Sequence, residues 1–294
     1  MSTQIQRMRS DAGFIAALDQ SGGSTPKALM LYGIDESSYS TNDEMFDMVH
    51  AMRTRIMTNP RFHGDRVLGA ILFQNTLDRN VEGVPSSEYL WGEKRILPFL
   101  KVDYGLADEA GGVQVMKPVP DLGERLPVAR GKSVFGTKMR SVIKSASAEG
   151  IRAVVDQQFA LAAEIRAHGL VPIIEPEVDI HARDKAACEA LLRDRLREGL
   201  DAMTGELPVM FKLTLPDEAN YYREFCTHPK VLRVVALSGG YSREVANDKL
   251  AANTGVIASF SRALTEGLHV DLDAAAFAAV LGGSIESIAA ASAT

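Results

Sequence analysis

The stretch from Ile151 to Glu177, IRAVVDQQFALAAEIRAHGLVPIIEPE, decides the fold class. Up to His168 it has helical periodicity, and Gly169 is suited to end the helix. The residues that share the apolar side of this helix are Val154, Val155, Phe159, Ala162, Ala163 and Ile165. The following run, Leu170 to Ile174, is apolar without polar alternation, which is typical of a strand buried on both faces. The stretch therefore predicts a helix that leads back into a parallel sheet.

The same pattern recurs along the chain, with helical stretches such as Lys185 to Met203 between apolar runs. The eight apolar runs are Phe14 to Leu18, Val67 to Phe73, Phe99 to Val102, Ser133 to Thr137, Leu170 to Ile174, Pro208 to Leu213, Leu232 to Leu237 and Gly255 to Ser259. Eight strand–helix units in 294 residues favour a closed (β/α)8 TIM barrel of the α/β class over an open sheet, since such barrels usually take about 250 residues. We expect a single domain, 1–294, with Tyr32 to Arg66 and Gly105 to Lys132 as surface excursions.

Composition narrows the function classes. Hydrophobic residues make up 46% of the chain and charged residues 24%, and the net charge of −6 argues against a nucleic-acid partner. Cys188 and Cys226 cannot build a disulfide framework, which favours a reducing, cytoplasmic setting. The alanine-rich end, Leu272 to Ala293, is interrupted by polar residues and predicts an amphipathic helix with no membrane span. The six histidines have no metal-ligand spacing, so we expect no metal site.

Charged residues follow the apolar runs, at the strand ends where barrel enzymes carry their chemistry. Residues two apart on a strand share a face, so the charges of one strand end can point the same way. The predicted mouth contains the carboxylates Asp19, Asp103, Glu175 and Glu177 and the cations Lys101, Lys138, Arg140, Lys212 and Arg262. The mouth is thus slightly positive in an acidic protein, which favours an anionic substrate.

Two features of this mouth suggest particular chemistry. Lys212 lies inside an apolar run, where desolvation and the cation of Lys138 would both favour the neutral amine that can form a Schiff base. A lysine snorkelling from a strand end is the ordinary alternative. The turn Ser238-Gly239-Gly240, together with Arg262, offers backbone N–H groups, a hydroxyl and a guanidinium to a phosphate.

These residues resemble class I fructose-bisphosphate aldolase, the metal-independent Schiff-base type, from near the N-terminus to about Leu264, and the chain looks like its short bacterial branch. The segments that carry the resemblance are Leu18-Asp19-Gln20-Ser21-Gly22-Gly23-Ser24, Gly69-Ala70-Ile71-Leu72-Phe73, Leu100-Lys101-Val102-Asp103, Lys138-Met139-Arg140, Val171-Pro172-Ile173-Ile174-Glu175-Pro176-Glu177, Phe211-Lys212, Leu237-Ser238-Gly239-Gly240 and Ser259-Phe260-Ser261-Arg262-Ala263-Leu264. Each segment alone is weak, but their order at successive strand ends makes the combination specific.

The resemblance implies reversible cleavage of fructose 1,6-bisphosphate to dihydroxyacetone phosphate and glyceraldehyde 3-phosphate, in glycolysis and gluconeogenesis. Lys212 would form the imine, Glu175 would serve as acid and base with Glu177 in support, and Asp19 would take the C4 hydroxyl proton. Lys138 would hold the charge of Asp19 and orient the substrate. The residues implied to bind substrate are Lys101 and Arg140 near the sugar, Ser238, Gly239, Gly240, Ser261 and Arg262 at the ketose phosphate, and Ser21, Ser24 and Lys27 at the other phosphate. No cofactor or metal is implied.

The sequence departs from the family at three places. Gln74-Asn75 replaces the usual His-Glu, and Ala28 stands where a basic residue is common. The animal enzymes of the family use a tyrosine of a mobile tail for proton exchange on the enamine, whereas the last tyrosine here is Tyr241, and the group that moves this proton stays open. Three other functions stay open: a Schiff-base aldolase or transaldolase for another sugar phosphate, a non-covalent isomerase, and a catalytically idle scaffold. The oligomeric state is open as well, and exposed apolar residues on the outer helices could serve a homo-oligomer interface.

Two further segments carry a local structural signal. The segment Leu126 to Ser133 nearly matches a P-loop but lacks its first glycine, and we expect a loop that enters the fourth strand. Ser24 is expected to act as the N-cap of the helix that begins near Pro26, a position that also suits a phosphate.

Overall fold

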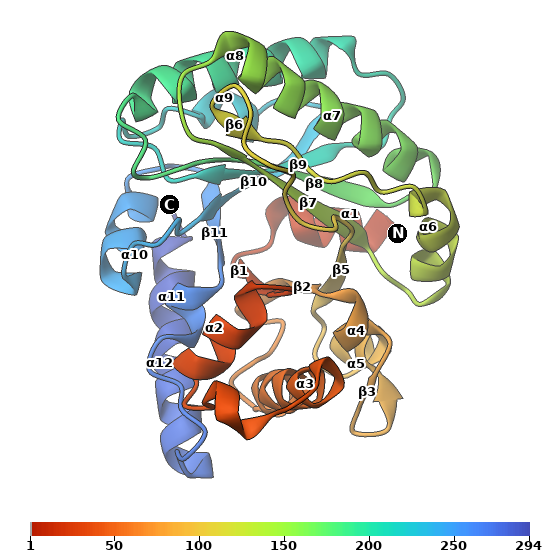
Figure 1. Cartoon of the computed structure of the whole chain (residues 1–294), viewed down its shortest axis with the longest axis vertical. Coiled ribbons are helices and arrows are strands. Elements are labelled where there is room, and N and C mark those ends of the chain that lie inside the picture. Colours follow the sequence, from red (N-terminus) through yellow and green to blue (C-terminus); the bar gives the residue numbers. More distant parts are fainter. Residues whose placement is uncertain (1) are drawn as a thin grey trace.

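The computed structural model describes residues 2–294 and contains a closed barrel of eight parallel strands (Figure 1). The strands adjoin one another in the order β5-β2-β1-β11-β10-β9-β8-β7, and a further pairing of β5 with β7 closes the ring. The barrel strands are β1 (Phe14–Leu18), β2 (Val67–Leu72), β5 (Leu97–Lys101), β7 (Gly136–Ile143), β8 (Val171–Val178), β9 (Val209–Thr214), β10 (Val231–Leu237) and β11 (Val256–Phe260). The predicted (β/α)8 TIM barrel is confirmed.

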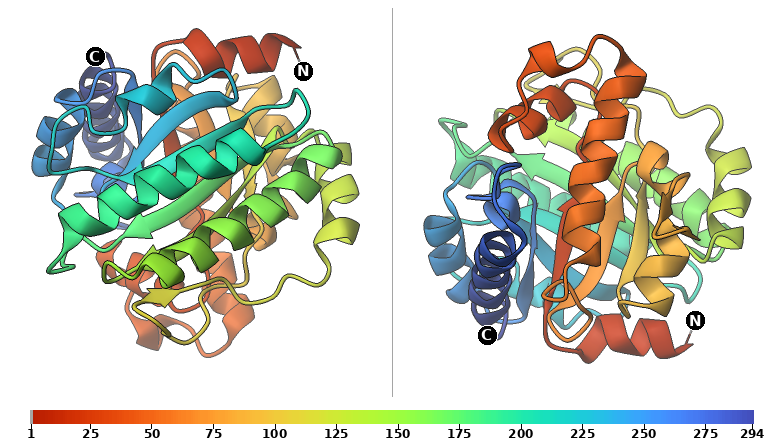
Figure 2. Two further views of the ribbon diagram at one scale, coloured as in Figure 1. Left: turned by 90° about the horizontal axis from the view of Figure 1, so that it is seen from above. Right: turned by 90° about the horizontal axis from the view of Figure 1, so that it is seen from below.

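Helices cover the outside of the barrel, and in the left view of Figure 2 the green helices α7 and α8 run side by side. The helices are α1 (Ser2–Ser10), α2 (Ser24–Leu31), α3 (Asn42–Thr58), α4 (Gln74–Leu77), α5 (Ser86–Gly92), α6 (Leu122–Gly131), α7 (Ala148–Ala167), α8 (Lys185–Ala202), α9 (Arg223–Cys226), α10 (Arg243–Ala251), α11 (Arg262–Thr265) and α12 (Ala274–Ala291), with a short 3-10 helix η1 (Glu36–Ser38). Outside the barrel ring, β6 (Val113–Gln114) pairs with β7, and β3 (Asn80–Val81) forms a hairpin with β4 (Val84–Pro85).

The inward-facing side chains change character halfway along the strands. On β8 the residues at alternate positions are Val171 and Ile173, then Glu175 and Glu177. The apolar members belong to an inner core that also includes Ile15, Leu68, Phe99, Met210 and Val235, and Met8 of α1 packs on it. A dry layer therefore fills the amino end of the barrel, and the charged residues gather at the carboxyl end.

Two strands extend further than the apolar runs suggested. The fourth strand was expected at Ser133 to Thr137, but β7 spans Gly136–Ile143 and so contains Lys138 and Arg140. Likewise, Glu175 and Glu177 lie within β8 rather than after it. Charged side chains interrupt the apolar pattern, but the backbone stays in the sheet because β7 and β8 pair along their whole length, from Gly136 opposite Val171 to Ile143 opposite Val178.

The expected surface excursions contain parts of the barrel wall. Residues 32–66 include α3, which buries Met45, Val49, Met52 and Ile56 against the strands. Residues 105–132 include α6, so the expected loop at Leu126 to Ser133 was wrong. The helix α6 buries Leu122, Leu126 and Ala129, a spacing of four and three residues that is helical despite Pro127.

The C-terminal helix α12 is long and apolar enough to cross a membrane by length and composition alone. In the structure it packs against β11, α10 and α11, and its inner face buries Phe277, Leu281, Ile285 and Ile288. The amphipathic interpretation is supported, because the apolar stripe of α12 has its partner in the barrel.

Candidate active site

A cavity of about 550 Å³ opens at the carboxyl ends of the strands. Its lining includes fourteen of the fifteen site residues expected from sequence: Asp19, Ser21, Ser24, Lys27, Lys101, Lys138, Arg140, Glu175, Glu177, Lys212, Ser238, Gly239, Ser261 and Arg262. Gly240 is not part of the lining, but it adjoins Arg262, since a Cβ added to Gly240 would lie 3.4 Å from Arg262 Nη2. Residues from seven strand ends and from α2 therefore meet in one hollow.

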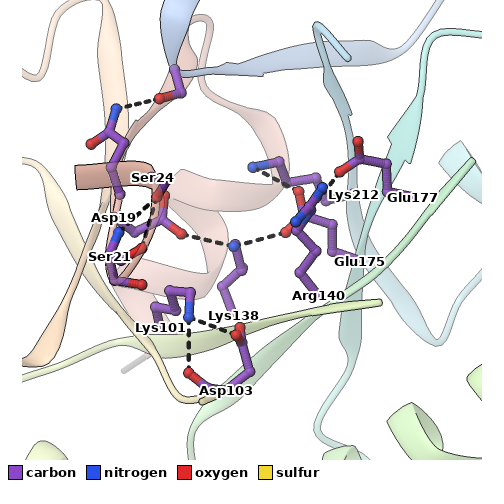
Figure 3. Close-up of polar contacts among 12 residues, drawn as sticks. Asp19, Ser21, Ser24, Lys101, Asp103, Lys138, Arg140, Glu175, Glu177 and Lys212 are labelled. Atoms are coloured by element: carbon purple, nitrogen blue, oxygen red, sulfur yellow. Dashed lines mark hydrogen bonds and ion pairs between the residues drawn. The ribbon is translucent and has the colours of Figure 1, made fainter. Parts of the chain in front are cut away.

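The floor of the cavity holds a chain of four charged groups (Figure 3). Lys138 Nζ lies 2.7 Å from Asp19 Oδ2 and 2.9 Å from Glu175 Oε2. The other oxygen of Glu175, Oε1, lies 3.0 Å from Lys212 Nζ. All four side chains are buried, and Lys212 is only 4% exposed. A carboxylate thus stands beside each lysine, and Glu175 contacts both of them.

Burial and charge compete in this chain. Burial by itself raises the pKa of Asp19, but the nearby ammonium groups of Lys138 and then Lys212 outweigh it and hold that pKa well below its ordinary value. Burial by itself lowers the pKa of Lys138, yet the carboxylates of Asp19 and Glu175 raise it above its ordinary value. Asp19 is therefore ionised and Lys138 is cationic at neutral pH.

Two further ion pairs flank the chain. Lys101 Nζ lies 2.6 Å from Asp103 Oδ1 and donates to the Asp103 carbonyl oxygen at 2.8 Å. Arg140 Nε lies 2.6 Å from Glu177 Oε2, and this carboxylate outweighs burial to raise the pKa of Arg140. Figure 3 shows both pairs beside the four-group chain, so the cavity mouth is lined by fixed charges of both signs.

Main-chain and side-chain bonds hold Glu175 in place. The Glu175 N–H donates to Oε1 of Gln158, a fully buried residue of α7, at 2.8 Å. Gln158 Nε2 in turn donates to Ser141 Oγ on β7 at 3.1 Å. The outer helix thereby fixes the β8 backbone at the residue that contacts both lysines.

The turn after β10 consists of glycines in a left-handed conformation. Gly239 and Gly240 both have positive φ, at +62° and +119°. A Cβ on Gly239 would lie 2.6 Å from Ile180 Cγ2, so glycine is required there by both conformation and space. Because β11 is the neighbour of β10, Ser261 and Arg262 join this turn at the same side of the cavity.

The α2 side of the cavity combines polar and apolar residues. Ser24 Oγ accepts from the N–H of Ser21 and donates to its carbonyl oxygen, and Gly23 occupies the N-cap position of α2 without a side-chain bond. The expected N-cap role of Ser24 was therefore wrong, because its hydroxyl is used within the preceding turn. Ala28 and Leu31 also line this wall.

Sequence reasoning missed three lining residues of chemical interest, Gln20, Ser259 and Thr265. Gln20 directly follows Asp19, and its position in the strand-end segment was an available signal. The hydroxyl of Ser259 is buried without a hydrogen-bond partner inside residues 2–294. Within the same residues, no group of three His, Cys, Asp or Glu side chains is arranged to hold a metal ion.

Together, the barrel and its cavity have the arrangement of a (β/α)8 barrel enzyme, with buried lysines and carboxylates gathered at the carboxyl ends of the strands. A family model described as "Glycolytic: Fructose-bisphosphate aldolase class-I" matches residues 2–203. The chain belongs to the class I fructose-bisphosphate aldolase family.

Relatives agree with this assignment over nearly the whole chain. The class 1 fructose-bisphosphate aldolase of Porphyromonas gingivalis is 56% identical over 285 residues, covering 97% of both chains. That of Synechocystis is 57% identical over 291 residues, covering 99% of this chain and 97% of its own.

Solved structures show the same fold at low identity. The fructose-bisphosphate aldolase of Plasmodium falciparum, solved with TRAP and a small-molecule inhibitor, superposes with a TM-score of 0.82 at 21% identity, covering 99% of this chain and 93% of its own. A Corynebacterium glutamicum protein gives a TM-score of 0.56 at 12% identity, with 99% and 92% covered.

Proposed function

We propose that this enzyme cleaves fructose 1,6-bisphosphate reversibly into dihydroxyacetone phosphate and glyceraldehyde 3-phosphate, through an imine between Lys212 and the ketose carbonyl. The observation that carries the proposal is the position of Glu175, whose two oxygens lie 3.0 Å from Lys212 Nζ and 2.9 Å from Lys138 Nζ. One carboxylate can then exchange protons with the nucleophile while a permanent cation holds its other oxygen.

Imine formation needs two proton transfers at Glu175. Lys212 attacks as the neutral amine, and the proton that it must lose can pass to Glu175 Oε1. The amine adds to the C2 carbonyl to give a carbinolamine, and protonation of its hydroxyl by Glu175 expels water. The product is a protonated imine, whose positive charge makes it an electron sink.

Cleavage then uses the opposite end of the four-group chain. Asp19 accepts the proton of the C4 hydroxyl as the C3–C4 bond breaks, the aldehyde forms, and the bonding electron pair moves into the enamine on Lys212. Lys138 remains an ammonium between Asp19 and Glu175 and steadies both as their charges change. Protonation of the enamine at C3 and hydrolysis of the imine release dihydroxyacetone phosphate and restore the amine.

The two phosphates bind to different segments of the mouth. Ser238, Gly239 and Gly240, with Ser261 and Arg262, bind the ketose phosphate through N–H groups, hydroxyls and a guanidinium. Lys101 and Arg140 contact the sugar between the phosphates, and Glu177 orients Arg140. Ser21, Ser24 and Lys27 bind the second phosphate.

The protonated imine takes up the electron pair of the broken bond, so the reaction needs no metal and no cofactor. We propose that the enzyme works in the cytoplasm, in glycolysis and gluconeogenesis, without a nucleic-acid or membrane partner. Self-association through the outer helices is part of the same proposal.

Trapping the imine tests the mechanism. The purified enzyme is incubated with dihydroxyacetone phosphate and EDTA, reduced with borohydride, digested and mapped by peptide mass spectrometry. We expect the adduct on Lys212, and none in Lys212→Arg, which keeps the charge but cannot form the imine at neutral pH. Cleavage of fructose 1,6-bisphosphate is expected to persist in EDTA.

Several results would contradict the proposal. Cleavage that EDTA abolishes, with no adduct, would indicate a metal-dependent enzyme. Substantial activity of Lys212→Arg would indicate non-covalent chemistry. Turnover of fructose 1-phosphate or a deoxy-sugar phosphate without turnover of the bisphosphate would indicate an aldolase for another sugar.

A further inference from the structure

Arg53 is a buried arginine without a carboxylate partner. It lies on α3, is 0% exposed, and bonds within residues 2–294 to neutral oxygens only. Its Nε is buried without a hydrogen-bond partner. Because a buried cation that makes no direct ion pair is costly, this side chain is poorly explained by stability alone.

The guanidinium of Arg53 fixes the chain at the end of β1. Its Nη2 donates to the carbonyl oxygen of Gln20 at 2.6 Å and to the side-chain oxygen Oε1 of the same residue at 3.2 Å. Its Nη1 donates to Oγ1 of the buried Thr76, in α4 after β2, at 2.7 Å. Arg53 therefore ties together the ends of two neighbouring barrel strands.

Gln20 continues the connection to the last strand. Its Nε2 donates to the hydroxyl of Ser261 at 2.5 Å. Ser261 follows β11, which pairs with β1 where the first and last strands of the barrel meet. We call Arg53, Gln20 and Ser261 the seam network, because it crosses this junction at the active-site end.

The seam network adjoins two parts of the proposed machinery. Gln20 directly follows Asp19, and Ser261 directly precedes Arg262. We propose that Arg53 is a positioning residue for cleavage: through the main chain of Gln20 it orients Asp19, and through the side chain of Gln20 it orients the Ser261–Arg262 phosphate turn. This inference rests on the roles proposed above for these residues.

The charge of Arg53 fits the same role. Burial lowers the pKa of Arg53 to about 10, while the Asp19 carboxylate acts in the opposite direction. The guanidinium is therefore cationic at neutral pH, close enough to Asp19 for their charges to interact. Its planar fork also reaches Thr76 and Gln20 together, which a lysine ammonium cannot do with the same geometry.

The test compares kcat, KM and imine trapping in three variants. Arg53→Met is expected to lower kcat for fructose 1,6-bisphosphate about 10- to 100-fold, the effect of a small misplacement of a reacting group. With saturating dihydroxyacetone phosphate, borohydride trapping on Lys212 should stay within about twofold of the wild type, because Lys212 and Glu175 lie on other strands. Arg53→Lys should recover part of the loss. Gln20→Ala should mainly raise KM, about five- to tenfold, through the loosened phosphate turn.

A matched control is Arg233→Met at the other end of the barrel. Arg233 on β10 also donates to main-chain carbonyl oxygens, those of Met8, Arg9 and Asp11, and also has a buried Nε without a hydrogen-bond partner. Its loss should lower stability and leave kcat and KM within about twofold of the wild type.

The outcomes separate this inference from the proposed function. Wild-type kcat and KM in Arg53→Met, or losses that equal those of Arg233→Met, would overturn it. If Arg53→Met does not fold, unchanged kinetics in both Arg53→Lys and Gln20→Ala would overturn it. A wild-type enzyme that neither traps dihydroxyacetone phosphate nor cleaves the bisphosphate would instead remove the proposed function, and with it the reaction that Arg53 serves.

Discussion

Lys138 holds two buried carboxylates at once, those of Asp19 and Glu175, at 2.7 and 2.9 Å. Asp19 has its ion pair with this ammonium, Glu175 shares its charge between Lys138 and Lys212, and the two carboxylates have separate tasks in the proposed reaction. At the scale of single residues, the proposed chemistry therefore depends on one ammonium that two carboxylates share.

Replacing that cation should disable the enzyme. Lys138→Met leaves two buried carboxylates without their common partner, so we expect kcat to fall by about 100-fold or more. Steady-state kinetics on fructose 1,6-bisphosphate measure the effect. Lys185→Met is the control, because Lys185 is equally buried and lies 2.6 Å from Glu189, outside the cavity lining. It should lose stability and keep its kcat, and an equal fall of kcat in both variants would contradict the prediction.

Acid should weaken the fold partly through Asp19. Its pKa is lowered in the folded state from 3.8, so its stabilising contribution is present above that value and is lost as the pH falls toward the folded pKa. In urea unfolding, the free energy of unfolding of the wild type exceeds that of Asp19→Asn. This difference should become smaller as the pH is lowered from about 5 to about 3. A difference in unfolding free energy that is constant or grows toward low pH would disprove this.

At the scale of elements, each wall of the cavity comes from a strand end and the turn or helix after it. The β10 turn contributes N–H groups because its glycines have positive φ, and β11 contributes a hydroxyl and a guanidinium. Beside β11, the helix α2 that follows β1 presents Lys27 together with Ala28 and Leu31. The two proposed phosphate sites thus differ in their groups, with a guanidinium and glycine N–H groups at one and an ammonium at the other.

Gly239→Ala should impair phosphate binding. The added Cβ would meet Ile180 and the backbone would have to leave φ +62°, which moves the turn. We expect kcat/KM to fall about tenfold or more. Gly83→Ala is the control for backbone strain away from the cavity. Gly83 also has positive φ, at +82°, but no atom lies within 4 Å of its added Cβ. Equal kinetic losses in the two variants would contradict the proposed phosphate role.

Ala28→Arg should strengthen the weaker phosphate side. A guanidinium on this wall can bond the second phosphate, so KM for fructose 1,6-bisphosphate should fall about tenfold, with little change for fructose 1-phosphate. Met30→Arg adds the same charge on α2 at an exposed position outside the cavity lining and serves as the control. An equal effect of both variants, or on both substrates, would point to general charge attraction.

At the scale of the whole molecule, the barrel has a dry amino end and a charged carboxyl end. The inner core and the core between strands and helices account for most buried apolar side chains, and α12 completes the outer layer beside β11. The free energy gained by burying apolar side chains at the amino end offsets the cost of burying charged groups at the carboxyl end.

One domain should unfold as one unit. Calorimetry of the wild type is expected to give a single unfolding transition. Leu281 of α12 is fully buried, so Leu281→Ala should lower the free energy of unfolding by about 2–5 kcal/mol and move this transition to a lower temperature. Glu286→Ala on the exposed face of α12 should have a small effect. Two separate transitions, with only one moved by Leu281→Ala, would argue against the single domain 1–294.

Much of the fold could be predicted from sequence because its signals are local. An apolar run and the helical stripe after it are encoded within about twenty residues, as from Ile151 to Ile174, and eight repeats of this unit imply the barrel. The local pattern failed at α6, where Pro127 and two glycines hid a helical stripe, and at β7, where Lys138 and Arg140 interrupted an apolar run.

The sequence by itself determined the barrel and the charged strand ends, because alternation along a strand decides which side chains face inward. The resemblance of its segments to a known family supplied the other candidate site residues. Only the tertiary structure decided which charges meet. Glu175 lies between Lys138 and Lys212, and Arg53 reaches Ser261 through Gln20, a residue 241 positions away from Ser261. Such contacts depend on strand register and on the closure of the barrel. Both arise from packing of the whole chain, so no local periodic pattern in the sequence predicts them.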